Sequence, residues 1–582
     1  MNINKYDINN PLILSYIVSI GIYSLVYKMV RFFPFLRKQY RETFINYIGR
    51  LLIKIPIVNK IYKSKMDKVY ISSQEKIIKQ LSLYDNHMMT IPNQGWTNGQ
   101  IINLIDHYKT ITLQKVINKH ISGTIYSNSL IKTCEDKFMC NEIRLKKRQK
   151  RLFTYAFESS YHWNALHQDE FDIGVLLDYQ VVNMVGDMFG GNRETISGIV
   201  TSDGSESLMC AMRAYRNFGM CEKGHQPYES VIIALETVHA AIMKAGDAYN
   251  IKIVLIPTDE YGIVDITILN ETAYKYRHEL VAIIGSAPCY CTGRIDPIKS
   301  MALIAKKYNC GLHVDCCLDG FIINFLEYDT DFLKIDGVTS LSADTHKNGY
   351  APKGSSVLVT KKMNGYDKYL IEYSIYSIPE WSGGVYGTIK DNGSISSVPA
   401  LTSLVSMLIM GKETYKEIAN KVQRHIITLT NKIRLIDDFI VLNTHNINIV
   451  AWKMNHTKLY RKGLIYVLAH EMSKEGVIVN AMKNEVVHFC ITHRFIENNN
   501  SIDEFMLILN NALIESKKIN LSGIEFSGDA GMYCSLSSAL IPSKSTTWSL
   551  WLENILFGQM GANEAIKKHF MGLLKPFHQI SQ

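Results

Sequence analysis

A lysine and a histidine stand side by side in a glycine-flanked segment that runs from Ser342 to Ser356. Its sequence is Ser-Ala-Asp-Thr-His-Lys-Asn-Gly-Tyr-Ala-Pro-Lys-Gly-Ser-Ser, which places Lys347 between two short apolar segments. A lysine held at a strand end among small residues can have the pKa of its amine depressed and become nucleophilic. That is what a Schiff-base lysine needs, and pyridoxal 5′-phosphate (PLP) is the cofactor most often held in this way. Because a single lysine after a strand is more often a solvated loop charge, the hypothesis depends on the residues elsewhere in the chain.

Three further segments offer groups that would complement this cofactor. Gly204 and Ser205 open a predicted helix, where backbone N–H groups and a hydroxyl can hold a phosphate. His239 follows an apolar segment and could stack on a flat ring, and Asp315 ends another apolar segment. A carboxylate buried there is costly unless paired, and a protonated pyridine nitrogen would pair it. Each signal alone also fits a capping loop, a core histidine or a backbone-satisfied aspartate, but together they follow the chain order of fold-type I PLP enzymes.

The elements that must position these residues show a regular pattern from about residue 164 to 370. Predicted strands at Val231–Leu235, Lys252–Ile256, Leu280–Ser286, Gly311–Val314, Val338–Leu341 and Ser356–Thr360 alternate with helices such as Glu206–Phe218, Ala240–Tyr249 and Ile298–Tyr308. Helices between buried strands indicate an α/β fold whose mostly parallel sheet is covered on both faces. Ligands of such sheets bind beyond the carboxyl ends of the strands.

At 582 residues the chain is too long for one hydrophobic core, and four regions are predicted. Residues 1–65 form an anchor and a basic juxtamembrane segment, and residues 66–160 form a helical segment, to which the resemblance described below assigns a part in the dimer and the active site. Residues 161–420 form the large PLP-binding domain. Residues 421–582 form a smaller α/β domain and a tail, with strands predicted at Phe439–Leu442, Ile447–Trp452 and Val486–Thr492 and helices at Leu459–Glu475 and Ser501–Ser516.

Charge and cysteine content exclude several classes of function. The net charge of +9 is modest for this length, so it does not indicate nucleic-acid binding. The 11 cysteines include no Cys-x-x-Cys pair, and free thiols in a reducing compartment are expected, with no metal site.

The N-terminal segment Pro11–Val30 is apolar except for Lys28 and is close to the roughly 20 residues that span a bilayer. Basic residues follow it rather than precede it, which predicts a single-pass anchor with the rest of the chain in the cytosol. The alternative is an apolar helix packed on the protein. A second stretch, Tyr47–Tyr62, could lie on a membrane surface. The basic run Arg144–Arg151 is expected to be a solvated insertion, with an anionic-lipid contact as the alternative.

Motifs along the chain resemble those of the sphingosine-1-phosphate lyase family, within the PLP-dependent decarboxylase-like group. The resemblance runs from the N-terminal anchor to about Tyr533, and the segment Ser342–Ser356 is its most specific part. The other matching segments are Ser122–Ser127, Asn164–His167, Thr201–Ser207, His239–Ala241, Ile295–Pro297, His313–Asp315, Trp381–Tyr386 and His488–Thr492.

The resemblance implies a role for each matching residue around the cofactor. Lys347 would be the Schiff-base lysine, Asp315 the partner of the pyridine nitrogen, and His239 the stacking ring. Gly204 and Ser205 would hold the cofactor phosphate.

Further matches concern catalysis and the substrate. His346 would lie against the cofactor and Asn164 beside it. Tyr126, His167 and Lys353 match positions that hold the substrate phosphate, the first two reaching in from the other subunit of a homodimer.

The family's reaction is a retro-aldol cleavage of sphingosine 1-phosphate, or another phosphorylated long-chain base, to a long-chain aldehyde and phosphoethanolamine. A cytosolic site on the endoplasmic reticulum membrane would suit such a substrate. Two alternatives stay open: a PLP-dependent amino-acid decarboxylase, and a catalytically inactive membrane-bound scaffold.

The chain also departs from the family pattern at several positions. Asp203 replaces a glycine of the phosphate loop, where its carboxylate should weaken PLP binding unless it points away. Asn348 replaces a tyrosine, Ala165 a proline, Thr292 a histidine and Ile395 an arginine.

Overall fold

The computed structural model describes residues 119–122, 141–167, 170–259, 261–378, 381–384, 386–442, 445–455, 463–482, 485–498 and 500–518, with isolated positions between 60 and 110. Every element named below belongs to one compact unit, residues 96–533. Tyr126, the predicted anchor Pro11–Val30 and the stretch Tyr47–Tyr62 lie outside the described residues. None of the helices that the structure describes combines the length and apolar character of a membrane span.

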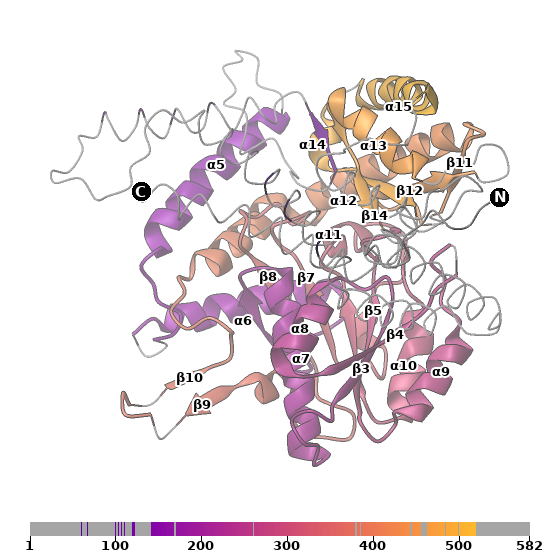
Figure 1. The fold of residues 1–582 in the computed structure, drawn as a ribbon. Helices are drawn as coiled ribbons and strands as arrows, with labels where there is room; N and C mark the ends of the chain where they lie inside the picture. The colour runs from indigo at the N-terminus through magenta and orange to yellow at the C-terminus, as the bar shows by residue number, and fades with distance from the viewer. Residues whose placement is uncertain are drawn as a thin grey trace, which may run out of the picture. The chain divides into compact units, whose positions relative to one another are not determined.

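The centre of this unit is a seven-stranded sheet with the order β2-β8-β7-β6-β5-β3-β4 (Figure 1). Its strands are β2 (Ser197–Thr201), β3 (Val231–Leu235), β4 (Lys252–Ile256), β5 (Leu280–Ser286), β6 (Gly311–Asp315), β7 (Ser340–Ala343) and β8 (Ser356–Thr360). Only β8 runs against its neighbours, so the expected mostly parallel sheet is confirmed. The central strands β3, β5 and β6 are buried throughout, because helices cover both faces.

Side-chain alternation shows which helix covers which face. Helices α7 (Gly204–Glu222) and α8 (Ala241–Tyr249) pack with Ile232, Ala234 and Ile284 in one core cluster. A Cβ added at Gly285 would instead meet Ile298 and Met301 of α10 (Ile298–Lys307). Because neighbouring residues of a strand point to opposite faces, α10 covers the face opposite α7.

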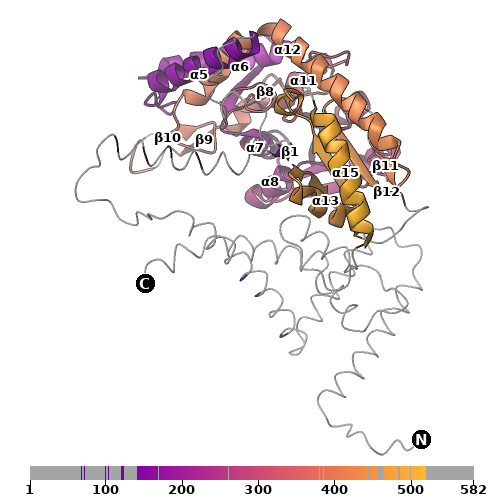
Figure 2. The same ribbon diagram turned by 90° about the horizontal axis from the view of Figure 1, so that it is seen from above.

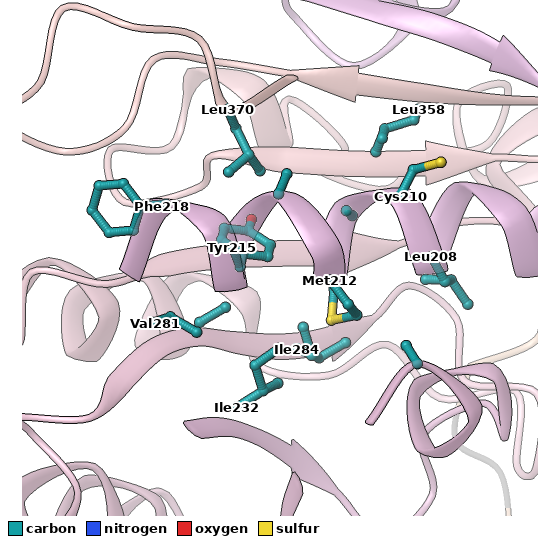
Figure 3. Packing of buried hydrophobic residues seen from close by; sticks show 14 of the residues in the cluster. Leu208, Cys210, Met212, Tyr215, Phe218, Ile232, Val281, Ile284, Leu358 and Leu370 are labelled. Atoms are coloured by element: carbon teal, nitrogen blue, oxygen red, sulfur yellow. The ribbon is translucent and has the colours of Figure 1, made fainter. Parts of the chain in front are cut away.

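The core under α7 depends on one close approach. Tyr215 of α7 is fully buried, and its hydroxyl lies 2.8 Å from Thr339 Oγ1 and 2.7 Å from Ser340 Oγ (Figure 3). A Cβ at Gly311 would come within 2.2 Å of Tyr215 Cε1, so β6 must begin with a residue that has no side chain. The buried hydroxyl is satisfied by β7 and the residue before it, which fixes α7 on the sheet.

Helix α6 (Asp172–Met188) packs on β2 and β8, and α9 (Ile266–Lys275) packs against α10. The long helix α12 (Val398–Arg434) changes direction at Gly411, whose φ of 60° is non-helical. Helix α5 (Asn141–Ser160) lies along α12, where Gln149 is buried and donates to Met410 Sδ.

A second, four-stranded antiparallel sheet follows α12. It is formed by β11 (Phe439–Val441), β12 (Ile449–Met454), β15 (Val486–Cys490) and β14 (Asn480–Met482). Helices α13 (Leu464–Lys474) and α15 (Ser501–Lys518) pack together, and α13 lies on this sheet. Figure 2 shows α5 and α6 beside the long helix α12, which leads toward α15 and the strands β11 and β12. The short strand β1 (His120–Ile121) pairs with β13 (Val477–Ile478). Strands β9 (Tyr376–Ile378) and β10 (Tyr386–Thr388) form a separate two-stranded antiparallel hairpin. The sequence reasoning did not predict this hairpin. Short elements complete the chain: α11 (Gly320–Ile323), α14 (His493–Ile496) and the 3₁₀ turns Phe332–Lys334 and Leu370–Ser374.

The basic run Arg144–Arg151, expected to be a solvated insertion, forms the first half of α5. Arg148, Lys150 and Arg151 are exposed, whereas Gln149 between them is buried. The run is therefore part of a packed helix that places its described basic side chains in solvent.

Candidate active site

The carboxyl ends of three parallel strands meet at one edge of the large sheet. Asp315 at the end of β6 is in register with Ser286 of β5 and Ser342 of β7. Asp315 is 8% exposed, and its Oδ1 accepts the backbone N–H of Cys317 at 3.0 Å. Among the described residues this is the one hydrogen bond to that carboxylate, which leaves acceptor capacity for a cationic partner.

Lys347 lies beyond the end of β7, as the sequence predicts, but its electrostatic state differs from the expectation. Its Nζ is 2.8 Å from Oδ2 of Asp344, and the two side chains are 23% and 1% exposed. Burial is the largest effect and by itself would lower the pKa of Lys347, but the charge and hydrogen bond of Asp344, together with Cys317 and Asp315, raise it overall. The predicted depression of this pKa is therefore wrong for the protein without its cofactor, because Asp344 stabilises the ammonium form.

Asp344 also connects the lysine to the start of α7. A Cβ at Gly204 would lie 2.7 and 2.9 Å from the two carboxylate oxygens of Asp344, so only glycine fits there. Burial would raise the pKa of Asp344, but Lys347 and then His346 lower it overall. Its Oδ1 is buried and has no hydrogen-bond partner among the described residues. Sequence reasoning missed this residue, although it stands three positions before Lys347.

Two acidic side chains cap the start of α7, in the loop that is expected to bind the cofactor phosphate. Asp203 is the N-cap of α7, and its Oδ1 accepts the N–H of Glu206 at 2.7 Å. Glu206 Oε2 in turn accepts the N–H of Ser202, the residue before the cap, at 2.6 Å. The carboxylate of Asp203 is therefore turned onto the helix end, where it occupies one N–H. Ser205 is half-buried and Gly204 is buried at that end.

His239 lies between β3 and α8, on the exposed side of the strand ends. Its Nδ1 accepts the N–H of Ala241 at 3.2 Å. The ring of Tyr290 meets it edge-on at 6.4 Å between centroids and meets the buried His488 at 4.7 Å. Since Nδ1 accepts, His239 is held in one orientation, with its ring kept beside Tyr290.

His346 and Lys353 flank the lysine. The Nδ1 of His346 lies 2.6 Å from the carbonyl oxygen of Ser355, and its Nε2 lies 3.8 Å from Asp344 Oδ2. Burial lowers the pKa of His346 and of Lys353, and the positive charge of Lys347 lowers both further. Lys353 is thus a second cation near Lys347, which suits a region that receives anionic groups, whereas the lowered pKa leaves His346 mostly neutral at pH 7.

The predicted residues Asn164 and His167 lie elsewhere in the same chain. Asn164 forms a β-bridge with Ser396 and donates to Ser394 Oγ at 3.1 Å, whereas His167 is exposed. None of the hydrogen bonds that the structure describes joins either side chain to the Lys347 segment. Tyr126 lies outside the described residues, but Ser122 of its motif accepts from Asn480 and from the N–H of Cys490.

Two of the departures from the family pattern lie next to each other. The N–H of Ala165 donates to the carbonyl oxygen of Ile395 at 2.9 Å. Both residues line a cavity of about 310 Å³ between α6, β2 and the segment after β10. The ion pair of Asp178 and Lys390, at 3.1 Å, also lines it.

Asn348, a third departure, joins a buried polar cluster behind Lys347. Its Nδ2 donates to Oδ1 of Asp319 at 2.8 Å, and Asn448 Nδ2 donates to the same oxygen at 2.5 Å. Burial raises the pKa of Asp319 to about 8, opposed by Lys347 and by the two amides. A carboxyl that is largely neutral at pH 7 therefore fills the space behind Asn348, a feature that sequence reasoning did not find.

These residues fit PLP. Asp315 has acceptor capacity at a strand end, α7 starts with a glycine where a Cβ would clash with Asp344, and Lys347 contacts that same Asp344. Asp344 keeps a buried oxygen without a partner among the described residues. The donor set therefore matches a cofactor with an anionic phosphate, a flat ring and a basic ring nitrogen.

Comparisons with known proteins agree with this reading of the site. Residues 162–455 match the family described as the pyridoxal-dependent decarboxylase conserved domain. Sphingosine-1-phosphate lyase 1 of Rattus norvegicus is 30% identical over 460 residues, which cover 77% of this chain and 74% of that protein. Sphingosine-1-phosphate lyase of Saccharomyces cerevisiae is 27% identical over 495 residues, which cover 83% and 78%.

Solved structures share the fold. A sphingosine-1-phosphate lyase of Burkholderia pseudomallei superposes with a TM-score of 0.65 at 23% identity, covering 75% of this chain and 95% of that one. Glutamate decarboxylase of Lactobacillus brevis gives 0.57 at 16% identity, covering 76% and 97%. The profile match, the identity to the rat protein and the shared fold show that this chain belongs to the sphingosine-1-phosphate lyases, within the family of pyridoxal-dependent decarboxylases.

Proposed function

We propose that this protein is a PLP-dependent aldehyde lyase that cleaves a phosphorylated long-chain base, such as sphingosine 1-phosphate, between C2 and C3. The products are a long-chain aldehyde and phosphoethanolamine. The observation that carries the proposal is the placement of Lys347, Asp344 and Asp315 at one sheet edge, in a chain of the lyase family. Relatives named sphingosine-1-phosphate lyase occur in animals, plants, yeast and a bacterium.

The protein's own residues have distinct tasks in this reaction. PLP, when bound, supplies an electron sink for the carbanion that is left when the C2–C3 bond breaks. Asp315 would hold the ring nitrogen protonated through its free acceptor capacity, and His239 would stack on the ring. Gly204 and Ser205 would offer the start of α7 to the phosphate, beside the Asp203 cap. Lys347 would be the covalent attachment point, with His346 beside it.

The test is an assay of purified protein with sphingosine 1-phosphate, in which aldehyde and phosphoethanolamine are both quantified. Equimolar release of the two products in the presence of PLP is expected. Glutamate and an aromatic amino acid serve as comparison substrates. Carbon dioxide release from either, without aldehyde from the lipid, would make the protein an amino-acid decarboxylase. No turnover on any of them and no bound PLP would favour the scaffold alternative.

Lys353→Ala is expected to raise KM for the phosphorylated base by roughly tenfold or more while leaving the affinity for PLP within about twofold. Burial lowers the pKa of Lys353, and the nearby charge of Lys347 lowers it further. Lys353 therefore lies close to Lys347, where it would meet the substrate phosphate. KM from the aldehyde assay and a PLP titration measure the two effects. Lys412→Ala, an exposed lysine of α12, is the matched control. Equal weakening of both ligands would place Lys353 at the cofactor phosphate instead.

We further propose a homodimer in which Tyr126 and His167 of one subunit complete the site of the other. In support, the side chain of His167 is exposed in its own chain. Large apolar side chains are also exposed on α6 and near the β9–β10 hairpin, including Leu176, Tyr179 and Trp381. A surface of this kind is typical of a subunit contact.

Mixing two inactive variants tests the shared site. Lys347→Ala and His167→Ala proteins should each be inactive, but a mixture that exchanges subunits should recover about a quarter of wild-type activity. Half of the dimers would then be heterodimers, and each would hold one intact site of two. A mixture that stays inactive after subunit exchange has been verified would mean that each chain builds its own site.

For the location we propose a single-pass anchor at Pro11–Val30, with the catalytic part in the cytosol and the endoplasmic reticulum as the membrane. Support comes from the apolar length of this segment and the basic residues that follow it. Carbonate extraction of membranes from cells that express the full chain, compared with a chain lacking residues 1–65, tests the anchor.

A further inference from the structure

Two cysteines flank Tyr290 in the turn after β5. Their sulfur atoms contact the same acceptor, because the carbonyl oxygen of Thr237 lies 3.7 Å from Cys289 Sγ and 3.6 Å from Cys291 Sγ. The N–H of Gly293 donates to the carbonyl oxygen of Cys289 at 2.9 Å, which closes the turn. Residues two apart have Cα atoms at most about 7 Å apart, and a turn shortens that distance into the range that a disulfide needs.

One sulfur of this pair has thiolate character. A hydrogen bond from Cys291 lowers the pKa of Cys289 to about 6, against the effect of burial, and Thr292 adds to the lowering. The pKa of Cys291 is raised in return. Burial raises the pKa of Cys310 and of Cys316, which are therefore poor nucleophiles. Thiolates are the form that peroxides oxidise, so the pair is more reactive than Cys310 and Cys316.

Access and position also favour the pair. Cys289 is 2% exposed, and Cys291 is half-buried. The residue between them, Tyr290, is 40% exposed and holds the ring of His239 edge-on. Thr237, whose carbonyl both sulfurs contact, precedes His239 by two residues. The two thiols therefore contact the backbone of Thr237, just before His239, and flank Tyr290, whose ring packs against His239.

We propose that Cys289 and Cys291 form a reversible disulfide when a peroxide oxidises them, and that this disulfide weakens PLP binding by displacing Tyr290 and Thr237 from around His239. The effect on PLP rests on the stacking role of His239 proposed above. The formation of the disulfide does not depend on that role.

The chemistry balances with one peroxide. A thiolate sulfur attacks a peroxide oxygen, the O–O bond breaks, and the sulfur becomes a sulfenic acid while the first water forms. The second thiol then attacks that sulfur, the S–O bond breaks, the S–S bond forms, and the second water leaves. Two thiols lose two electrons and the peroxide gains them. A disulfide across one intervening residue is strained, so a dithiol reductant reverses it readily.

The experiment uses the full-length protein loaded with PLP and treated with hydrogen peroxide. Remaining thiols are blocked with N-ethylmaleimide, and the peptide that contains both cysteines is weighed after digestion. We expect a peptide lighter by two hydrogen atoms that carries no maleimide. We also expect roughly three- to tenfold weaker affinity for PLP, the range that losing one aromatic contact gives. Dithiothreitol should restore both values.

Matched variants separate the outcomes. Cys289→Ser and Cys291→Ser should each keep their PLP affinity in peroxide, whereas Cys221→Ser, which removes an exposed cysteine of α7, should respond like the wild type. Failure to form the Cys289–Cys291 disulfide, or a disulfide that leaves PLP affinity unchanged, would overturn the proposal. A reduced protein that binds no PLP would instead refute the cofactor site, and the peptide mass would still decide the thiol chemistry.

Discussion

Lys347→Ala is expected to abolish turnover, with a loss of roughly a thousandfold or more. Lys347 is the amine at the strand ends that lies closest to Asp344, at 2.8 Å, with Gly204 and Asp315 close by. Its removal takes away the covalent attachment point, which neighbouring cations such as Lys353 cannot replace from their own positions. The measurement is aldehyde release together with borohydride reduction followed by peptide mapping, which in the wild type should fix PLP onto Lys347.

The same experiment distinguishes loss of chemistry from loss of folding. Lys347→Ala should still bind PLP, weakly and without being fixed by borohydride, since Asp315, His239 and the start of α7 remain. Lys412→Ala should retain wild-type turnover and the covalent label. Turnover near the wild-type value in Lys347→Ala would mean that another residue holds the cofactor.

Asp344→Asn is expected to lower the free energy of unfolding of the PLP-free protein by about 2 to 4 kcal/mol. The substitution leaves the Lys347 ammonium, 23% exposed, without its carboxylate partner. Because the folded-state pKa of Asp344 is lowered, the contribution of this pair is complete above the ordinary aspartate pKa and is lost only as the pH falls through the lower value. Chemical denaturation at neutral pH therefore measures the whole effect.

Two controls isolate the charge pair. Lys334 and Asp331 form an i,i+3 pair at 2.7 Å that is 65% and 52% exposed, so Asp331→Asn should change stability by less than about 1 kcal/mol. The double variant Lys347→Met with Asp344→Asn should recover much of the lost stability, since no charge is left buried without a partner. Additive losses in the double variant would show that the two side chains contribute independently.

Much of the fold could be predicted because local patterns reflect burial. Strands β3, β4, β5 and β8 have the predicted bounds, since each is a short, mostly apolar segment rich in Val, Ile and Leu. The strand β2 and the β9–β10 hairpin were not predicted, because β2 includes Gly198 and the hairpin is exposed or half-buried. These strands form by pairing with segments that are distant in the sequence, and a short stretch of sequence does not show that pairing.

Part of the candidate site could likewise be predicted from the sequence, and part could not. The sequence predicted that Gly204, His239, Asp315 and Lys347 act together, and the structure places all four at the carboxyl edge of the large sheet or on the loops that follow it. It gave no sign that Asp344 would reverse the expected pKa shift of Lys347, because that contact depends on how the loop folds back on the end of α7.

By itself, the sequence determined the α/β fold class, the PLP cofactor and the lyase family, because each depends on residue types at fixed spacing along the chain. The tertiary structure alone decided which residues three of the departures contact: Asn348 contacts Asp319, Ala165 contacts Ile395, and Thr292 contacts Cys289. These partners come from different loops or strands, or depend on the shape of one turn. The order of strands in the sheet brings them into contact, and hydrogen bonds and burial then set their pKa values and their chemistry.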